Sequence, residues 1–317
     1  RSRAFQGYNF YTSGDLPGAI LMDMEGNIVH EWRKEFLEIW PDCPKEVYDA
    51  ELEFTRKDLR HHEYWFRARL LRDGSVIGFF EDLGIFQLDR DSNVRWKLQG
   101  RFHHDFDIAG DGTIHALVRR STEYDLFGRH EMIYDDGIAR IGPEGIIDIT
   151  SIINCFIGSP YIDHLYGMKR RGDLLHTNTL EILDGRLAGR IPAFRKGNIL
   201  ISLRESSLIA VIDLEAQKVV WTLGGMWVEQ HHPTVLDNGN IMLFDNRGNY
   251  GKSEILEFDP LTQEIEWAYG GGGTFFSKWV GTNQRLPNGN TLITETDYGR
   301  AFEVTPEGEI VWEFVNP

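Results

Sequence analysis

The fold is decided by two hairpin phrases that follow one another, LDNGNIMLF (Leu236–Phe244) and FDPLTQEIEW (Phe258–Trp267). In the first phrase an apolar strand meets a turn containing Gly and Asn, and a second apolar strand follows. In the second phrase a strand ends in an acidic or polar turn, and the next strand carries a Trp. Two hairpins supply four antiparallel strands, so one pair of phrases predicts one four-stranded sheet.

Both phrases recur along the chain, and the second occurs six times. Its other copies are Leu21–Trp32, Leu88–Trp96, Ile141–Ile149, Ile212–Trp221 and Val304–Trp312. The first phrase returns at Leu71–Phe80, Ile108–Leu117, Arg195–Leu203 and Leu286–Thr294. Regular repetition of one sheet is typical of radial architectures.

A four-stranded sheet cannot bury both of its faces alone, so repeated sheets stack around an axis with their Trp and other apolar side chains between them. We therefore predict an all-β fold, a six-bladed β-propeller of four-stranded antiparallel blades with a central channel. The alternative is an open sandwich or two separate β domains. We expect one propeller domain over residues 1–317, closed by joining the N- and C-terminal strands, with insertions at about 35–64 and 154–195.

The composition narrows the possible partners. A formal net charge of −16 repels phosphate backbones and anionic lipid surfaces, which disfavours nucleic acid as a partner. No apolar stretch is long enough to span a membrane. The two cysteines, Cys43 and Cys155, allow one disulfide or two thiols. The compartment stays open, periplasmic or secreted if a signal peptide has been removed and otherwise cytoplasmic, and so does the oligomeric state.

Histidines occupy matched positions on different blades. Counting eight residues back from the hairpin glycines Gly112 and Gly239 reaches His104 and His231. The innermost strands of a propeller line its channel, so residues at matched depth face one another across a space of small-molecule size. A third histidine, His176, stands in the run DLLHTNT (Asp173–Thr179).

Further polar residues accompany these histidines. Asn178 lies two residues after His176, on the same side of an extended chain. Arg204 follows a strand phrase and offers a guanidinium suited to a tetrahedral anion. We predict a catalytic site formed by the three histidines with Asn178 and Arg204, and we expect contacts to substrate from His62, His103, Asp105 and His232.

Several runs in order resemble the arylsulfotransferase family. They include FHHDFDIAGDGTI (Phe102–Ile114), LLHTNT (Leu174–Thr179), QHHPTVLDNGNIMLFDNRG (Gln230–Gly248) and GTNQRLPNGNTLITE (Gly281–Glu295). The resemblance implies a six-bladed propeller that moves a sulfuryl group from one phenol to another without a nucleotide donor or other cofactor. The expected partner is a small aromatic molecule.

The resemblance also implies roles for single residues. His231 would be the nucleophile that becomes transiently sulfated, and His104 would match the histidine of the family's His-Asp motif. His176, Asn178 and Arg204 would grip the sulfuryl oxygens and assist the leaving phenolate. A neutral imidazole is a competent nucleophile near pH 7, and a covalent intermediate splits one difficult displacement into two easier ones.

Two other functions remain open at this point. In one, His104, His176 and His231 hold a divalent metal ion for a lyase, hydrolase or isomerase reaction. In the other, the propeller binds a ligand without catalysis. A fixed cation such as Arg204 beside the histidines favours an anionic substrate over a metal.

Overall fold

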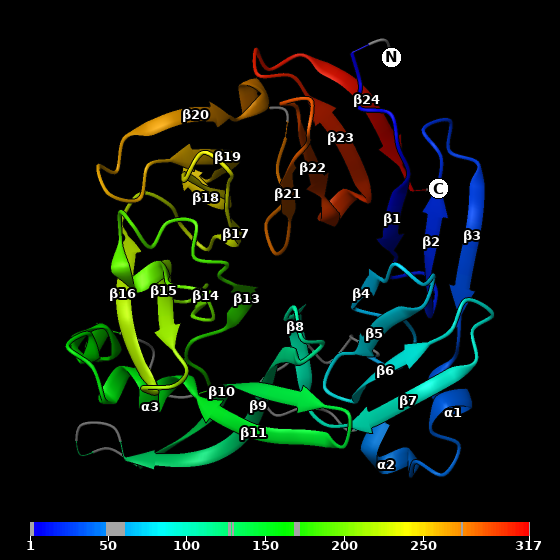
Figure 1. Ribbon diagram of the computed structural model, residues 1–317, viewed down its shortest axis with the longest axis horizontal. Coiled ribbons are helices and arrows are strands. Elements are labelled where there is room, and N and C mark those ends of the chain that lie inside the picture. Colours follow the sequence, from blue (N-terminus) through cyan, green and yellow to red (C-terminus); the bar gives the residue numbers. More distant parts are fainter. Residues whose placement is uncertain are drawn as a thin grey trace.

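A computed structural model describes residues 3–48, 61–125, 128, 130–167, 172–273 and 275–316. Six antiparallel sheets surround a central axis, and the chain passes from one sheet to the next around the ring (Figure 1). The predicted six-bladed β-propeller is therefore confirmed. The predicted hairpin phrases coincide with hairpins of the blades, except for Arg195–Leu203, which contains the strand Ile199–Leu203 and only the end of a longer connection from the strand Thr177–Ile182.

The first three blades run from the innermost strand outward. Blade 1 contains β1 (Asn9–Thr12), β2 (Gly18–Met22) and β3 (Ile28–Arg33). Blade 2 contains β4 (Arg67–Leu70), β5 (Val76–Phe80), β6 (Gly84–Leu88) and β7 (Val94–Gln99). Blade 3 contains β8 (Phe102–Ile108), β9 (Ile114–Asp125), β10 (His130–Gly142) and β11 (Gly145–Ser151), and the short β12 (Gly172–Asp173) pairs in parallel with β10.

The other three blades follow the same order. Blade 4 contains β13 (Thr177–Ile182), β14 (Ile199–Leu203), β15 (Leu208–Asp213) and β16 (Lys218–Gly224). Blade 5 contains β17 (His231–Val235), β18 (Ile241–Asn249), β19 (Lys252–Phe258) and β20 (Ile265–Tyr269). Blade 6 contains β21 (Thr282–Arg285), β22 (Thr291–Glu295), β23 (Arg300–Val304) and β24 (Ile310–Val315).

The first hairpins of blades 3, 5 and 6 use the same glycine conformation. Gly112, Gly239 and Gly289 all have φ of 88°. This left-handed conformation is strained for residues with a Cβ atom, which explains why each copy of the phrase carries Gly at this position. The shared turn gives the inner strands a common reference point.

Tryptophan side chains join neighbouring blades, as the repeated phrase predicts. The indole Nε1 atom of Trp32 in blade 1 donates to the Gly74 carbonyl in blade 2 at 3.2 Å. Trp267 in blade 5 donates to the Pro306 carbonyl in blade 6 at 2.8 Å. A Trp on the outermost strand of each of these blades therefore packs toward the next blade and donates to one of its carbonyls.

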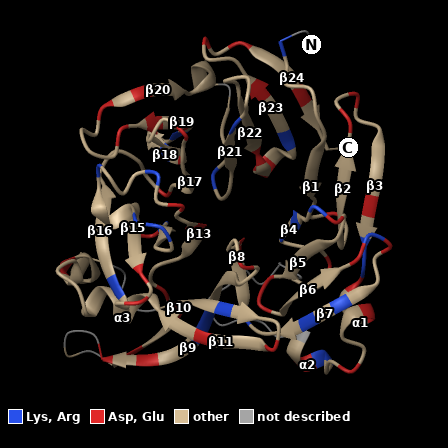
Figure 2. Ribbon diagram, in the orientation of Figure 1, with Lys and Arg blue, Asp and Glu red and all other residues tan. Residues whose placement is uncertain are grey.

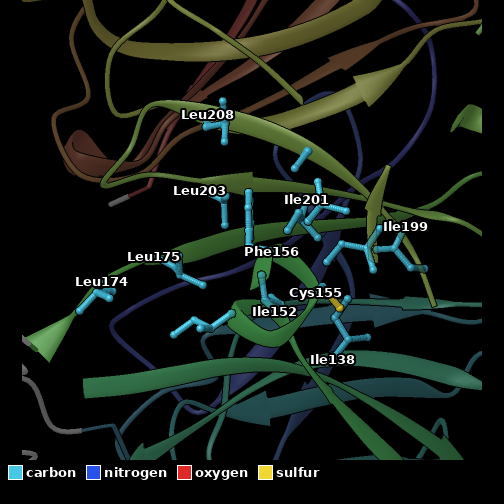
Figure 3. Packing of buried hydrophobic residues seen from close by; sticks show 14 of the residues in the cluster. Ile138, Ile152, Cys155, Phe156, Leu174, Leu175, Ile199, Ile201, Leu203 and Leu208 are labelled. Carbon is cyan, nitrogen blue, oxygen red and sulfur yellow. The ribbon is translucent and has the colours of Figure 1, made fainter. Parts of the chain in front are cut away.

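The middle strands of the blades are buried on both faces. All residues of β14 and β15 are buried, in keeping with their nearly continuous apolar sequence. Between blades 3 and 4, α3 (Ile152–Ile157) inserts Ile152, Cys155 and Phe156 against Ile201 of β14 (Figure 3). The apolar core thus continues from blade to blade around the ring.

The ring closes in a different way from that expected. The prediction that N- and C-terminal strands share one sheet is wrong, because β24 is the outer strand of blade 6 and β1 is the inner strand of blade 1. Side chains make the closure instead. Trp312 Nε1 donates to the Met24 carbonyl at 3.0 Å, and the Tyr11 and Phe314 rings lie 5.5 Å apart.

The two irregular stretches differ from one another. Residues 35–48 form α1 (Phe36–Ile39) and α2 (Lys45–Tyr48), and the expected insertion continues beyond them outside the described residues. The stretch 154–195 contains η1 (Ile162–Gly167) and η2 (Pro192–Phe194), but also β13, the inner strand of blade 4. The short β12, just before β13, also pairs with blade 3. The remaining 3-10 turns are η3 (Gly271–Gly273) and η4 (Thr296–Tyr298).

The charged residues and the two cysteines do not change this description of the fold. Lys and Arg are interspersed with Asp and Glu over the blades (Figure 2). Cys43 and Cys155 are free thiols. Among the described helices, none is long and apolar enough to cross a membrane.

Candidate functional site

A pocket of about 660 Å³ lies on the axis of the ring. It is lined by residues at or next to the inner strand of every blade: Phe10 and Tyr11, Phe66 and Arg67, His104, Asn178 and Thr179, His231 and His232, and Gly281 and Thr282. Its volume suits a small aromatic molecule. Four of the predicted site residues, His104, Asn178, His231 and His232, therefore meet in one pocket.

His231 is held in one tautomer. Its Nδ1 atom lies 2.8 Å from Asn246 Oδ1 and 3.1 Å from the Glu229 carbonyl oxygen. The Asn246 amide nitrogen donates to the Ser277 and Val280 carbonyls, so the oxygen of the amide faces the histidine. Since both partners are acceptors, Nδ1 carries the proton and Nε2 carries the lone pair.

The Nε2 atom of His231 is buried without a hydrogen-bond partner among the described residues. Burial lowers the pKa of His231 to about 3, and the positive charges of His176 and Arg204 act in the same direction. The ring is therefore neutral at physiological pH. A neutral imidazole with an unpaired nitrogen beside a pocket is able to act as a nucleophile.

His176 has the opposite electrostatic state. Burial opposes its charge, but the Asp173 carboxylate, 2.6 Å from Nδ1, outweighs burial and raises the pKa of His176. The His176 ring lies 4.8 Å from the His104 ring, centroid to centroid. The pair of histidines thus combines one ring whose pKa is raised with one whose pKa is lowered.

His104 is neutral and rests on a buried polar layer. Burial, followed by the charge of His176, lowers its pKa well below the usual value. Its Nδ1 atom lies 2.9 Å from Nδ1 of His103, whose own Nε2 lies 3.6 Å from the Asp136 carboxylate. Burial lowers the pKa of His103 to about 3. His103 therefore supports His104 from behind and does not line the pocket.

Asp105 and His62, both expected to contact substrate, also lie outside the pocket lining. The Asp105 carboxylate is buried and accepts the backbone N–H groups of Phe106 at 2.8 Å and Leu180 at 3.0 Å. His62 lies half-buried in the turn before β4. Asp105 thus ties blade 3 to blade 4.

Arg204 lies behind the histidines and is occupied by carboxylates. One Nη atom donates to Glu205 and the other to Glu229, each at 2.6 Å, and the guanidinium stacks over the Trp279 ring. Its charge acts on both His176 and His231. Arg204 is not among the residues that line the pocket, and both of its Nη atoms are bound by carboxylates, so its expected role at the sulfuryl oxygens stays a prediction.

Backbone bulges set the direction of three histidines. His104, His176 and His232 have φ of 54°, 47° and 51°. His104 lies inside a register shift of β8, His232 lies inside one of β17, and His176 precedes one in β13. A bulge re-aims side chains locally, so strict strand alternation does not determine where these histidines point.

The sequence analysis missed Arg67, the cation that does line the pocket. Arg67 stands at the start of β4 beside Phe66. A signal was present, because counting eight residues back from Gly74 reaches Phe66. It also missed Asp173 and Asn246, the residues that set the charge of His176 and the tautomer of His231; Asp173 stands in the same run as His176, whereas nothing in the sequence pairs Asn246 with His231.

The described residues do not provide a ready set of ligands for the metal ion of the alternative function. The part of the chain that the structure describes contains no group of three His, Cys, Asp or Glu side chains that could hold a metal ion. The Nδ1 atoms of His104, His176 and His231 are each taken by a protein partner. This leaves Nε2 of each ring for a ligand among the described contacts, and His176 is not among the residues that line the pocket.

Comparison with solved structures shows the propeller fold. A protein of unknown function from Bacteroides caccae is 13% identical, with a TM-score of 0.58 over 99% of this chain and 94% of that one. The Cps50 (Swd1) propeller domain of Myceliophteria thermophila is 8% identical, with a TM-score of 0.55 over 97% and 83%. A catalytically inactive virginiamycin B lyase from Staphylococcus aureus is 10% identical, with a TM-score of 0.52 over 98% and 84%.

Comparison of sequences is more specific about the family to which the chain belongs. No curated protein matches the chain. The profile of the family described as arylsulfotransferase (ASST) matches residues 67–317, which include five of the six blades and every predicted catalytic residue. The chain therefore belongs to the arylsulfotransferase family.

Proposed function

We propose that the axial pocket transfers a sulfuryl group from an aryl sulfate to a phenolic acceptor through an intermediate sulfated on Nε2 of His231. The observation that carries this proposal is the state of His231, a neutral ring whose Nδ1–H is bound by two acceptors and whose Nε2 lone pair is unpaired. Membership of the arylsulfotransferase family supports sulfuryl transfer in general.

The first half-reaction forms the intermediate. The Nε2 lone pair of His231 attacks sulfur, the bond from sulfur to the phenolic oxygen breaks, and the leaving phenolate takes a proton from the His176 imidazolium. The sulfated ring is an imidazolium whose Nδ1–H still donates to Asn246 and Glu229. These two oxygens stabilise the positive charge that develops on the ring.

The second half-reaction reverses these steps with a new phenol. His176, now neutral, takes the proton of the acceptor hydroxyl, the acceptor oxygen attacks sulfur, and the N–S bond breaks to restore neutral His231. Asn178 and the neutral His104 line the same pocket and are suited to contact the sulfuryl oxygens and the phenolic oxygen. Arg204 stabilises the negative charge of the sulfuryl group from behind His176 and His231.

The direct test is the intact mass of the protein after exposure to 4-nitrophenyl sulfate without an acceptor. We expect a gain of one sulfuryl group, located on His231 by peptide mapping and lost when phenol is added. The variant His231→Ala should not gain this mass, whereas His130→Ala, which changes an exposed histidine on β10, should behave as the unmodified protein. Release of 4-nitrophenol without a sulfated histidine, or no reaction at all, would overturn the proposal.

A further inference from the structure

One wall of the axial pocket combines aromatic rings with a single arginine. Phe10 and Tyr11 of β1 and Trp65, Phe66 and Arg67 at the start of β4 lie on this side. Phe66 stacks on Phe79 and contacts the His104 ring edge, at centroid distances of 5.7 and 5.4 Å. Aromatic side chains of this kind pack against the ring of a substrate. The arginine beside them then lies near the position of a substituent on that ring.

The Arg67 side chain has capacity for one more partner. Its Nε atom lies 3.0 Å from Asp105 Oδ1, and one Nη atom lies 3.5 Å from Nε2 of His232. Among the described residues, the other Nη atom has no hydrogen-bond partner, and 24% of the side chain is exposed. Asp105 shares its charge with two backbone N–H groups and does not occupy every donor of Arg67, which itself lines the pocket.

This arginine is separate from the reacting centre. The charges that act on His231 come from His176 and Arg204, whereas the charge that acts most strongly on the neighbouring His232 comes from Arg67. His232 lies in the bulge of β17 next to His231, and both side chains line the pocket, so one pocket contains two electrostatic regions. A group bound at Arg67 is therefore a different group from the one that reacts at His231.

We infer that Arg67 recognises a carboxylate on the aromatic substrate, so that the preferred acceptors are phenols bearing an anionic substituent away from the reacting hydroxyl. The inference rests on the proposed function for the reacting end of the molecule. A guanidinium with two available donor directions forms strong, charge-assisted hydrogen bonds to a carboxylate. Such a contact also explains how an acidic protein binds an anionic ligand, because the cationic Arg67 lies in the pocket itself.

The first experiment measures binding without any reaction. Titration calorimetry compares 4-methoxyphenylacetate, which has no transferable hydroxyl proton, with its neutral amide, 4-methoxyphenylacetamide. We expect the carboxylate to bind at least about tenfold more tightly than the amide. We expect Arg67→Gln to remove that preference and Arg67→Lys to keep part of it.

A matched control lies on the same strand. Arg69 pairs with Asp107 at 2.7 Å and does not line the pocket, so Arg69→Gln should leave the preference unchanged. If Arg67→Gln fails to fold, Arg67→Lys and the comparison of the two probes on the unmodified protein still decide the question. Equal binding of carboxylate and amide to the unmodified protein, or a preference that survives Arg67→Gln, would overturn the inference.

The second experiment separates this inference from the proposed function. Protein sulfated by 4-nitrophenyl sulfate is discharged with 4-hydroxyphenylacetate, with its neutral amide, or with tyramine, which is cationic. We expect KM to rise from the acid to the amide to tyramine, and Arg67→Gln to raise only the KM of the acid. Sulfation of His231 with no preference among acceptors would contradict the role of Arg67 alone. No sulfation, with a carboxylate preference in calorimetry, would contradict the proposed reaction alone.

Discussion

The Nδ1 atom of His231 lies 2.8 Å from Oδ1 of Asn246, and the Asn246 amide nitrogen is itself bound to the Ser277 and Val280 carbonyls. This chain of contacts determines which nitrogen of His231 faces the pocket. A residue on β18 thereby sets the chemistry of a residue on β17.

Replacing Asn246 should slow sulfation without a comparable loss of donor binding. Asn246→Leu removes the acceptor for Nδ1–H, so the rate of sulfation should fall at least about tenfold, as expected when the orienting partner of a catalytic histidine is lost. Asn246→Asp keeps an acceptor and should retain more activity than the leucine variant. Stopped-flow release of 4-nitrophenol measures the rate. Asn288→Leu, in the β21–β22 hairpin, is the control, and equal rates for all four proteins would refute the role.

The pH dependence should follow His176. The Asp173 carboxylate holds the pKa of His176 above 6.5, so the protonated ring is present below that raised pKa and is lost as pH rises through it. Transfer from phenyl sulfate, whose leaving phenolate needs a proton, should decline over the same range. Asp173→Asn leaves burial as the main influence, lowers the pKa of His176 and should move the decline to lower pH.

The comparison donor for this profile is 4-nitrophenyl sulfate, whose leaving group is stable as an anion. Its rate should depend less on pH over the same range. The same ionisation affects folding, because the contribution of the charged His176 to stability is fully present below pH 6.5 and is lost above its raised pKa. An alkaline decline that stays in place in Asp173→Asn would contradict this assignment.

Metal removal should leave the reaction unchanged. The proposed steps use only side chains, so dialysis against a chelator should alter the sulfation rate by less than about twofold, well under the effect of removing one catalytic group. Metal analysis of the purified protein accompanies the rate measurement. Stoichiometric bound metal whose removal abolishes activity, and whose return restores it, would favour the metal-dependent alternative.

Closure of the ring should depend on Trp312. This side chain is 8% exposed, and its Nε1 atom donates to the Met24 carbonyl of the neighbouring blade. Trp312→Phe removes the hydrogen bond and should lower the free energy of unfolding by about 1 kcal/mol. Trp312→Ala also removes the packed ring and should cost about 3 to 5 kcal/mol.

Urea unfolding measures both Trp312 variants. The control is Tyr250→Ala, which changes a side chain that is 98% exposed and should stay within about 0.5 kcal/mol of the unmodified protein. A Trp312→Ala variant as stable as the control would show that other contacts hold blades 6 and 1 together.

The blades could be predicted from sequence because their turns are local. Gly112 and Gly239 occupy the same left-handed turn, so the count from each glycine reached His104 and His231, which both line the pocket. The count did not show that β8 and β17 have bulges of different size, since a bulge depends on pairing across the sheet. It therefore gave the strand and the approximate depth, but not the direction of each ring.

The contacts that set the charge states could not be predicted in the same way. Asn246 lies 15 residues from His231, and Arg204 meets Glu229 across 25 residues. No short-range pattern in the sequence specifies such pairs, because they form only when β14, β17 and β18 converge. The prediction of how the ring closes was wrong for a related reason, because the register of β24 is set by β23 and not by β1.

The left-handed backbone at His104, His176 and His232 limits which amino acids can replace these histidines in related proteins. Of the ordinary amino acids, Asn, Asp and Gly accept that conformation readily, whereas Val, Ile and Thr do not. A family member that loses the reaction but keeps the propeller would therefore be expected to carry Asn or Gly there. Genomes could be screened for such inactive paralogues by the residues at these three positions together with the residue at His231.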